Sequence, residues 1–97
     1  MIWNLAPTKT FSQELKKFKK NKDFLDALDK KLQRLKQNPE AVGGYLSGRL
    51  HGYKATRIIS KFRILFKIAI SEHTVYLVAI DHRKHDYERF DVSDIYD

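Results

Sequence analysis

The side chains best suited to chemistry lie between positions 54 and 87. Arg57 and Arg63 stand six residues apart. His82, His85 and Tyr87 follow the last apolar run of the sequence. The planar guanidinium group of arginine matches the oxygens of a phosphate, and histidine can gain or lose a proton near neutral pH. These residue types predict a polyanionic ligand, RNA in particular, and a site at which a phosphate of that RNA reacts.

Metal-independent cleavage of RNA uses the 2′-hydroxyl group as the nucleophile on the neighbouring phosphate. The site must remove that proton, stabilise the added negative charge and protonate the leaving 5′-oxygen, and general acid–base catalysis contributes about 10²–10⁴-fold. In this interpretation Arg57 and Arg63 hold the phosphate and stabilise the transition state. His82 or His85 carries the proton, and Tyr87 orients the substrate. Four further cations are predicted to bind the RNA: Lys54, Lys61, Arg83 and Lys84.

Plainer interpretations of the same residues stay open. Arg63 could pair with Asp81 or another carboxylate across a sheet, and the histidines could be exposed and inert. The spacing of His82 and His85 would suit a metal, but no third committed ligand accompanies them, so neither a metal nor another cofactor is predicted. The sequence also lacks the motifs of phosphate-binding loops, dinucleotide sites, zinc proteases and serine hydrolases.

Composition limits the class of protein. The chain has 97 residues, which predicts a single domain over residues 1–97, and its 42% apolar content is enough for a core. It contains no cysteine, which excludes disulfides and a thiolate nucleophile. No stretch approaches the roughly 20 apolar residues of a membrane span, and the N-terminus does not resemble a signal peptide. We therefore expect a cytoplasmic protein with no membrane partner.

The charge of the chain is unevenly distributed. The formal net charge is +7, from 19 lysines and arginines against 12 aspartates and glutamates. Residues 81–97 hold three basic and six acidic side chains, so the first 80 residues carry a net charge of +10. A basic body attracts nucleic acid by contacting phosphates and releasing counterions. For the lysines at positions 16–22, a solubilising surface is the plainer alternative.

The first third of the sequence predicts a strand and two helices. Residues 1–6 form a short strand that stops at Pro7, and Thr8 or Thr10 then caps a helix. Three apolar residues of this helix fall on one face: Phe11, Leu15 and Phe18. A second helix is predicted from Lys22 to Gln37, where leucines and a phenylalanine recur at helical spacing. A proline at position 39 ends it.

A glycine-rich connector and three strands complete the predicted fold. The strands are expected at Lys54–Ile59, Phe62–Ile70 and Val75–Ile80. In the middle strand, apolar residues from Phe62 to Ile70 alternate with a mixed set that includes Arg63, so one face should cover the helices and the other should be the working surface. The predicted order is β-α-α-β-β-β, an α+β domain with an N-terminal helical hairpin packed on one face of a small antiparallel sheet.

These residues resemble a known family. The run Leu-x-Gly-x-Leu-x-Gly-Tyr at positions 46–53, together with Arg57 and Arg63, is similar to the YoeB/Txe-like branch of the RelE/ParE superfamily of toxins from type II toxin–antitoxin systems. The ending DHRKHDY at positions 81–87 is similar to the RelE-like pattern His-Arg-x-x-x-Tyr. The resemblance covers about residues 1–90.

The resemblance implies a microbial RNase-like fold and a toxin that arrests growth. Such a toxin enters the ribosomal A site, cuts the mRNA there as an mRNA interferase, and is neutralised by a co-expressed antitoxin. The implied partners are thus a cognate antitoxin, the ribosome and mRNA. Arg63 stands at the catalytic strand arginine of the family and Arg57 at a strand arginine of the YoeB-like branch. Lys54 stands at an active-site lysine of RelE-like members and Tyr87 at their C-terminal tyrosine.

The sequence departs from the family pattern at two positions. Thr56 occupies the second lysine position of RelE-like members, and Gly44 lies near the glutamate that serves as base in the YoeB-like branch. These differences leave open a ParE-like toxin that inhibits DNA gyrase without a nuclease site. A weaker alternative is an inactive toxin that survives only in its complex with the antitoxin.

Overall fold

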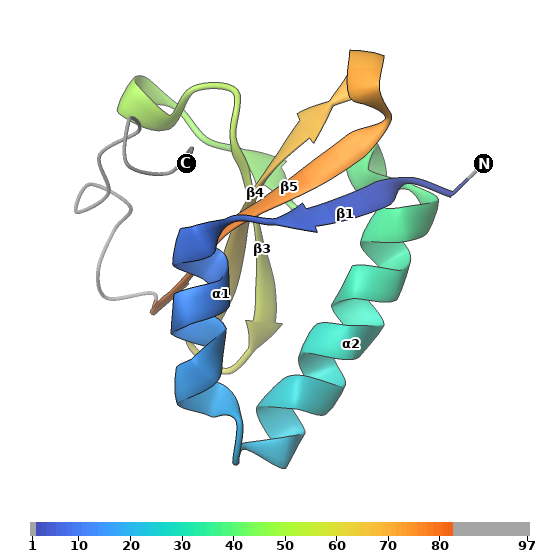
Figure 1. Cartoon of the computed structure of the whole chain (residues 1–97). Coiled ribbons are helices and arrows are strands. Elements are labelled where there is room, and N and C mark those ends of the chain that lie inside the picture. The colour runs from blue at the N-terminus through green and yellow to red at the C-terminus, as the bar shows by residue number, and fades with distance from the viewer. Residues whose placement is uncertain (1, 83–97) are drawn as a thin grey trace.

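The computed structural model describes residues 2–82, which form two helices against one face of a twisted five-stranded sheet (Figure 1). The helices are α1 (Lys9–Leu15) and α2 (Lys22–Gln37). The strands are β1 (Asn4–Pro7), β2 (Gly44–Tyr45), β3 (Lys54–Ile59), β4 (Phe62–Ala69) and β5 (Thr74–His82). Within these residues, neither helix is long and apolar enough to cross a lipid bilayer. The predicted α+β class and its helical hairpin are confirmed.

The strands lie in the order β1-β5-β4-β3-β2. The neighbours from β2 to β5 are antiparallel, as expected. At the other edge β1 runs parallel to β5, with Asn4 opposite Thr74 and Pro7 opposite Leu77. The predicted antiparallel sheet therefore contains one parallel pair, at this edge. The direction of a strand relative to one about 70 residues later is set by tertiary packing and leaves no local pattern.

Polar side chains fix where each helix begins. Thr8 Oγ1 accepts a hydrogen bond from Phe11 N–H at 3.3 Å, and Asn21 Oδ1 accepts one from Phe24 N–H at 3.0 Å. Thr8 is thus the N-cap of α1, and the alternative cap, Thr10, lies inside the helix. The predicted bounds of α2 are confirmed, because its strong apolar repeat lies between an N-cap and a proline.

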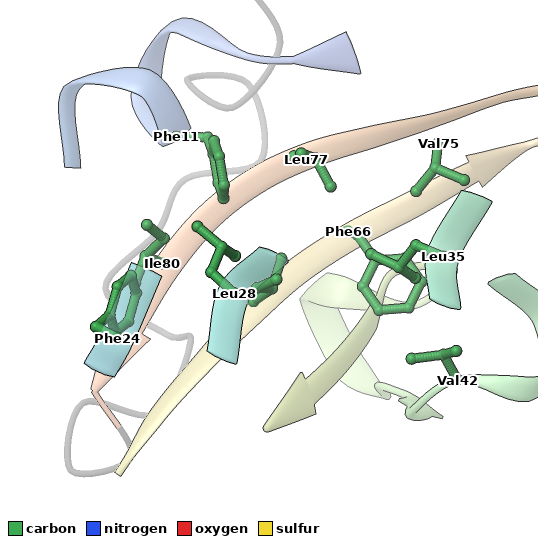
Figure 2. Close-up of a cluster of buried hydrophobic side chains, with 10 residues drawn as sticks. Phe11, Phe24, Leu28, Leu35, Val42, Phe66, Val75, Leu77 and Ile80 are labelled. Carbon is green, nitrogen blue, oxygen red and sulfur yellow. The ribbon is translucent and has the colours of Figure 1, made fainter. Parts of the chain in front are cut away.

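The main core lies between the helices and the sheet (Figure 2). Phe24, Leu28 and Leu35 of α2 are buried against one face of β4 and β5. On the sheet side the core residues are Ile64, Phe66, Val75, Leu77 and Ile80. The apolar face of β4 covers the helices as predicted, except at Ile70, which is 72% exposed because β4 ends at Ala69 and Ile70 begins a 3₁₀ turn.

A register shift in β5 creates a second, smaller core on the opposite face. Leu65 of β4 lies opposite Ala79, whereas its neighbour Phe66 lies opposite Leu77, so Val78 is an extra residue. Val78 and Ala79 both contribute to this core. The connector before β3 covers it with Leu50 and Tyr53, and Leu46 packs against it. The remaining part of this face carries the charged side chains of β3 and β4.

Candidate functional site

Arg57 and Arg63 face each other across β3 and β4. They are register partners in the antiparallel pair and lie on the face of the sheet away from the helices. Arg57 is exposed and Arg63 is half-buried. Side chains at such opposed positions have Cβ atoms about 4.5–5.5 Å apart, and two like charges there destabilise the pair. An anion between the guanidinium groups would offset that repulsion, and the two groups could grip a phosphate from two sides.

A buried carboxylate extends this pair into a row across three strands. Asp81 of β5 lies directly opposite Arg63 in the β4–β5 register and is 3% exposed. The sequence offered Asp81 only as a pairing partner for Arg63, and the structure places it in the position that such pairing requires. Its charge can hold the Arg63 side of the site in place while Arg57 stays open to solvent.

His82 lies on the other face of the sheet. Its ring packs edge-on against Phe62, with ring centroids 5.4 Å apart, at the margin of the helix-side core. The extra residue Val78 is the cause, because a shift of one residue exchanges the faces of all residues that follow in the strand. The expectation that His82 stands beside the two arginines as a proton carrier is therefore not met by this geometry.

Lys54 is also turned away from the arginine pair. It lies opposite Phe66 on the helix side and is 2% exposed. Its ammonium group donates hydrogen bonds to the carbonyl oxygens of Glu40 at 2.8 Å and Pro39 at 3.4 Å, and it lies 4.7 Å from the centroid of the Tyr45 ring. An ammonium group enclosed in this way is not exposed to an RNA ligand, so this geometry does not favour the predicted RNA contact of Lys54 and gives the side chain structural contacts instead.

The other predicted site residues divide into two groups. Lys61 is exposed in the tight turn between β3 and β4, two residues from Arg63 and next to Ser60, which has a φ of +54°. The remaining predicted site residues lie outside the described residues: Arg83, Lys84, His85 and Tyr87. Of the nine predicted residues, the structure therefore places Arg57, Arg63 and Lys61 at one end of one hairpin.

Residues 5–87 match the family of ParE toxins of type II toxin–antitoxin systems, parDE. The chain belongs to this toxin family. No curated protein sequence matches the toxin at a significant level.

Solved structures show the same fold. The toxin–antitoxin complex RelBE2 of Mycobacterium tuberculosis contains a chain with 26% sequence identity and a TM-score of 0.73, over 86% of the toxin and 100% of that chain. The YoeB/ParE toxin of Agrobacterium tumefaciens has 17% sequence identity and a TM-score of 0.73, over 81% of this chain and 96% of that toxin. A mutant of the E. coli toxin RelE in the free state has 18% sequence identity and a TM-score of 0.67, over 98% of this chain and 94% of that one. The toxin therefore belongs to the RelE/ParE superfamily, as its motifs predicted.

The surroundings of Thr56 bear on the departure from the RelE-like pattern. Thr56 lies opposite Ile64 on the helix side and is 7% exposed. It shares that face with Lys54, two residues earlier, so neither position faces the arginine pair. The lack of a lysine at position 56 removes no charge from the face that carries Arg57 and Arg63.

Proposed function

We propose that the toxin is a ribosome-dependent mRNA endonuclease that cuts mRNA in the A site and so blocks translation in the cytoplasm. The observation that carries this proposal is the opposition of Arg57 and Arg63 on the open face of the sheet. Two arginines at opposed positions on neighbouring strands favour a ligand with dense negative charge. The resemblance to RelE-like and YoeB-like toxins supports RNA as that ligand.

In the proposed mechanism, the two arginines stabilise the negative charge that develops during attack. As the 2′-oxygen bonds to phosphorus, negative charge grows on the non-bridging oxygens, and Arg57 and Arg63 stabilise it. The attacking 2′-hydroxyl group gives its proton to the proton carrier. The bond from phosphorus to the 5′-oxygen then breaks, the 5′-oxygen takes up a proton from the carrier, and a 2′,3′-cyclic phosphate remains. The sequence predicts His82 or His85 as the proton carrier and Tyr87 as the group that orients the substrate. The position of His82 on the other face of the sheet favours His85. Lys61 contributes a backbone contact from the adjoining turn.

The test compares wild-type toxin with arginine variants on translated mRNA. Arg63→Ala and Arg57→Ala should each lower the cleavage rate by about 10²–10³-fold, because each removes one charged donor from the transition state. Primer extension after induction of each variant measures the cuts, and Arg34→Ala, an exposed arginine on α2, is the control. Full cleavage by both Arg57 and Arg63 variants would contradict the proposal.

The same assay distinguishes the roles of the two histidines. His85→Ala should abolish cleavage, whereas folded His82→Ala should retain it, because the ring of His82 packs against Phe62. The reverse result would return the proton-carrying role to His82 and would mean that the strand end rearranges when RNA binds.

A second candidate function is inhibition of DNA gyrase. The match of residues 5–87 to ParE toxins favours it, as does the absence of a side chain at Gly44, near the glutamate position of YoeB-like toxins. In that case induction would cause DNA damage and loss of supercoiling while the mRNA stays intact. Intact mRNA with normal growth would instead indicate an inactive toxin.

For either function the proposed protein partner is a cognate antitoxin. RelBE2 of Mycobacterium tuberculosis and YoeB–YefM of Staphylococcus aureus are such complexes. A basic sheet face with Arg57 at its surface suits an antitoxin segment that carries acidic and apolar residues.

A further inference from the structure

The bend between the two helices carries the densest positive charge in the described residues. Five of the seven residues at positions 16–22 are lysines, and all five are exposed; this surface, the lysine bend, consists of Lys16, Lys17, Lys19, Lys20 and Lys22. No acidic residue lies within positions 16–22. The nearest acid before the bend is Glu14, whose Oε1 accepts a hydrogen bond at 3.0 Å from Ile80 N–H, and the nearest acid after it is Asp23 in the first turn of α2.

Aromatic packing fixes the lysine bend in place. Phe18 lies within the bend and stacks on Phe24 of α2, with ring centroids 3.9 Å apart. Both rings pack edge-on against Phe62 at the start of β4, at 5.0 and 5.5 Å. His82 also packs edge-on against Phe62, with ring centroids 5.4 Å apart. The lysines thus project from a fixed corner of the molecule and not from a free loop.

The lysine bend lies at the same end of the molecule as the arginine pair. Phe62 follows Lys61 directly and precedes Arg63, so the ring to which the bend is anchored belongs to the segment that carries the site. Figure 1 shows the bend between α1 and α2 and the turn between β3 and β4 at the same lower end of the domain. One basic surface can therefore continue from the arginine face around this end to the bend.

Local helix energetics do not account for the lysine bend. Lys16 and Lys17 come directly after α1, at the helix end where a positive charge interacts favourably with the helix dipole. Lys22 begins α2, at the end where a positive charge interacts unfavourably. Like charges three or four residues apart on a helical turn also repel one another, as Lys16 does with Lys19 and Lys20. Bound polyanion would offset this repulsion, and lysine ammonium groups suit contacts to phosphates that do not depend on base sequence.

We propose that the lysine bend is a second RNA-binding surface, which holds the phosphate backbone of RNA beyond the segment that is cleaved. The choice of RNA as the polyanion rests on the proposed function. The arginine pair then acts on one phosphate, while the lysine bend supplies affinity and orients the toxin on a larger RNA. Loss of the bend should weaken binding and leave the chemical step intact.

The test measures binding of a fluorescent 2′-O-methyl RNA, which lacks the nucleophilic hydroxyl and stays uncut, by anisotropy at several salt concentrations. The triple variant Lys17→Gln, Lys19→Gln, Lys20→Gln should bind at least about tenfold more weakly at low salt. Its slope of log K against log salt should be smaller by about 2, since each phosphate contact to a single strand contributes about 0.7. Circular dichroism and thermal melting confirm that the variant is folded, as expected for exposed side chains.

A matched triple variant removes the same charge elsewhere. Lys9→Gln, Lys30→Gln, Lys36→Gln changes the net charge equally but leaves the bend intact, and its salt slope should stay at the wild-type value. Equal losses in both triple variants would overturn the proposal, because net charge alone would then explain binding. An unchanged salt slope in the bend variant would also overturn the proposal, even if that variant had lost affinity for the antitoxin.

The outcomes also separate this inference from the proposed function. If Arg63→Ala loses cleavage while the bend variant binds and cleaves as wild type does, the nuclease stands and the second surface does not. If wild-type toxin cuts no mRNA but the bend variant alone loses RNA affinity, the second surface stands and the nuclease does not.

Discussion

Lys54 and Arg57 are three residues apart on β3, and this odd spacing turns their side chains to opposite faces of the sheet. Arg57 is exposed and lies opposite Arg63, whereas Lys54 is enclosed beneath the segment that follows α2 and donates hydrogen bonds to the carbonyl oxygens of Glu40 and Pro39. The parity of its position thus decides whether a strand cation faces the open side of the sheet or is enclosed on the helix side. The residue type alone does not distinguish the two.

Replacing Lys54 by methionine should destabilise the toxin. The change keeps most of the apolar stem but removes a charged donor and leaves buried carbonyls without it, so the free energy of unfolding should fall by about 1.5–3 kcal/mol. Urea unfolding measures the change. Lys61→Met, in an exposed turn, is the control and should stay within about 0.5 kcal/mol of wild type. If Lys54→Met unfolds like wild type but no longer cleaves RNA, Lys54 contacts the substrate after all.

At the scale of elements, the extra residue in β5 decides which side chains join the arginine face. Strict alternation from Val75 would place Asp81 toward the helices and His82 beside Arg63. The register shift at Val78 reverses both. Because residues 75–80 are apolar except for the Tyr76 hydroxyl, both alternations bury apolar side chains, and the pattern of the sequence cannot reveal the shift. Packing of Val78 and Ala79 under the connector favours the observed register.

The start of α1 gives a prediction at the same scale. Besides capping Phe11 N–H, Thr8 Oγ1 donates toward the carbonyl oxygens of Leu77 and Val78, each at 3.0 Å, and so ties the helix to the shifted part of β5. Thr8→Ala should lower the free energy of unfolding by about 1–2 kcal/mol, measured in urea. Thr10→Ala is the matched control, since Thr10 lies within the helix. A larger loss from Thr10→Ala would contradict the assignment of the cap.

At the scale of the whole molecule, the pairing of β1 with β5 joins the N-terminus to the last described strand. The Trp3 ring stacks on His73 with centroids 4.1 Å apart, and Trp3 N–H donates to Lys36 O at 2.8 Å. Asn4 N–H donates to His73 O at 3.1 Å, where the turn before β5 brings that residue to a φ of +52°. This corner therefore connects β1, the end of α2 and the β4–β5 turn.

Replacing Trp3 by alanine should weaken the attachment of β1 to the rest of the domain. Loss of a half-buried aromatic ring and its stacking should lower the free energy of unfolding by about 1–3 kcal/mol. In hydrogen exchange, the amides of β1 should lose protection before those of β4. Ile2→Ala is the control, because Ile2 is 71% exposed and should change stability by less than about 0.5 kcal/mol. Equal effects of the two substitutions would mean that the Trp3 stack does not hold β1.

Local patterns in the sequence predict the helices, the three long strands and the two arginines of the candidate site. Each depends on local signals: the apolar repeat of α2 between Asn21 and Pro39, alternation in β4, and paired cations around a turn. Tertiary structure alone decided the parallel direction of β1, the enclosure of Lys54, and the face on which His82 lies. The physical reason is that these features depend on register and burial between strands distant in sequence, where a shift of one residue exchanges the two faces of a sheet.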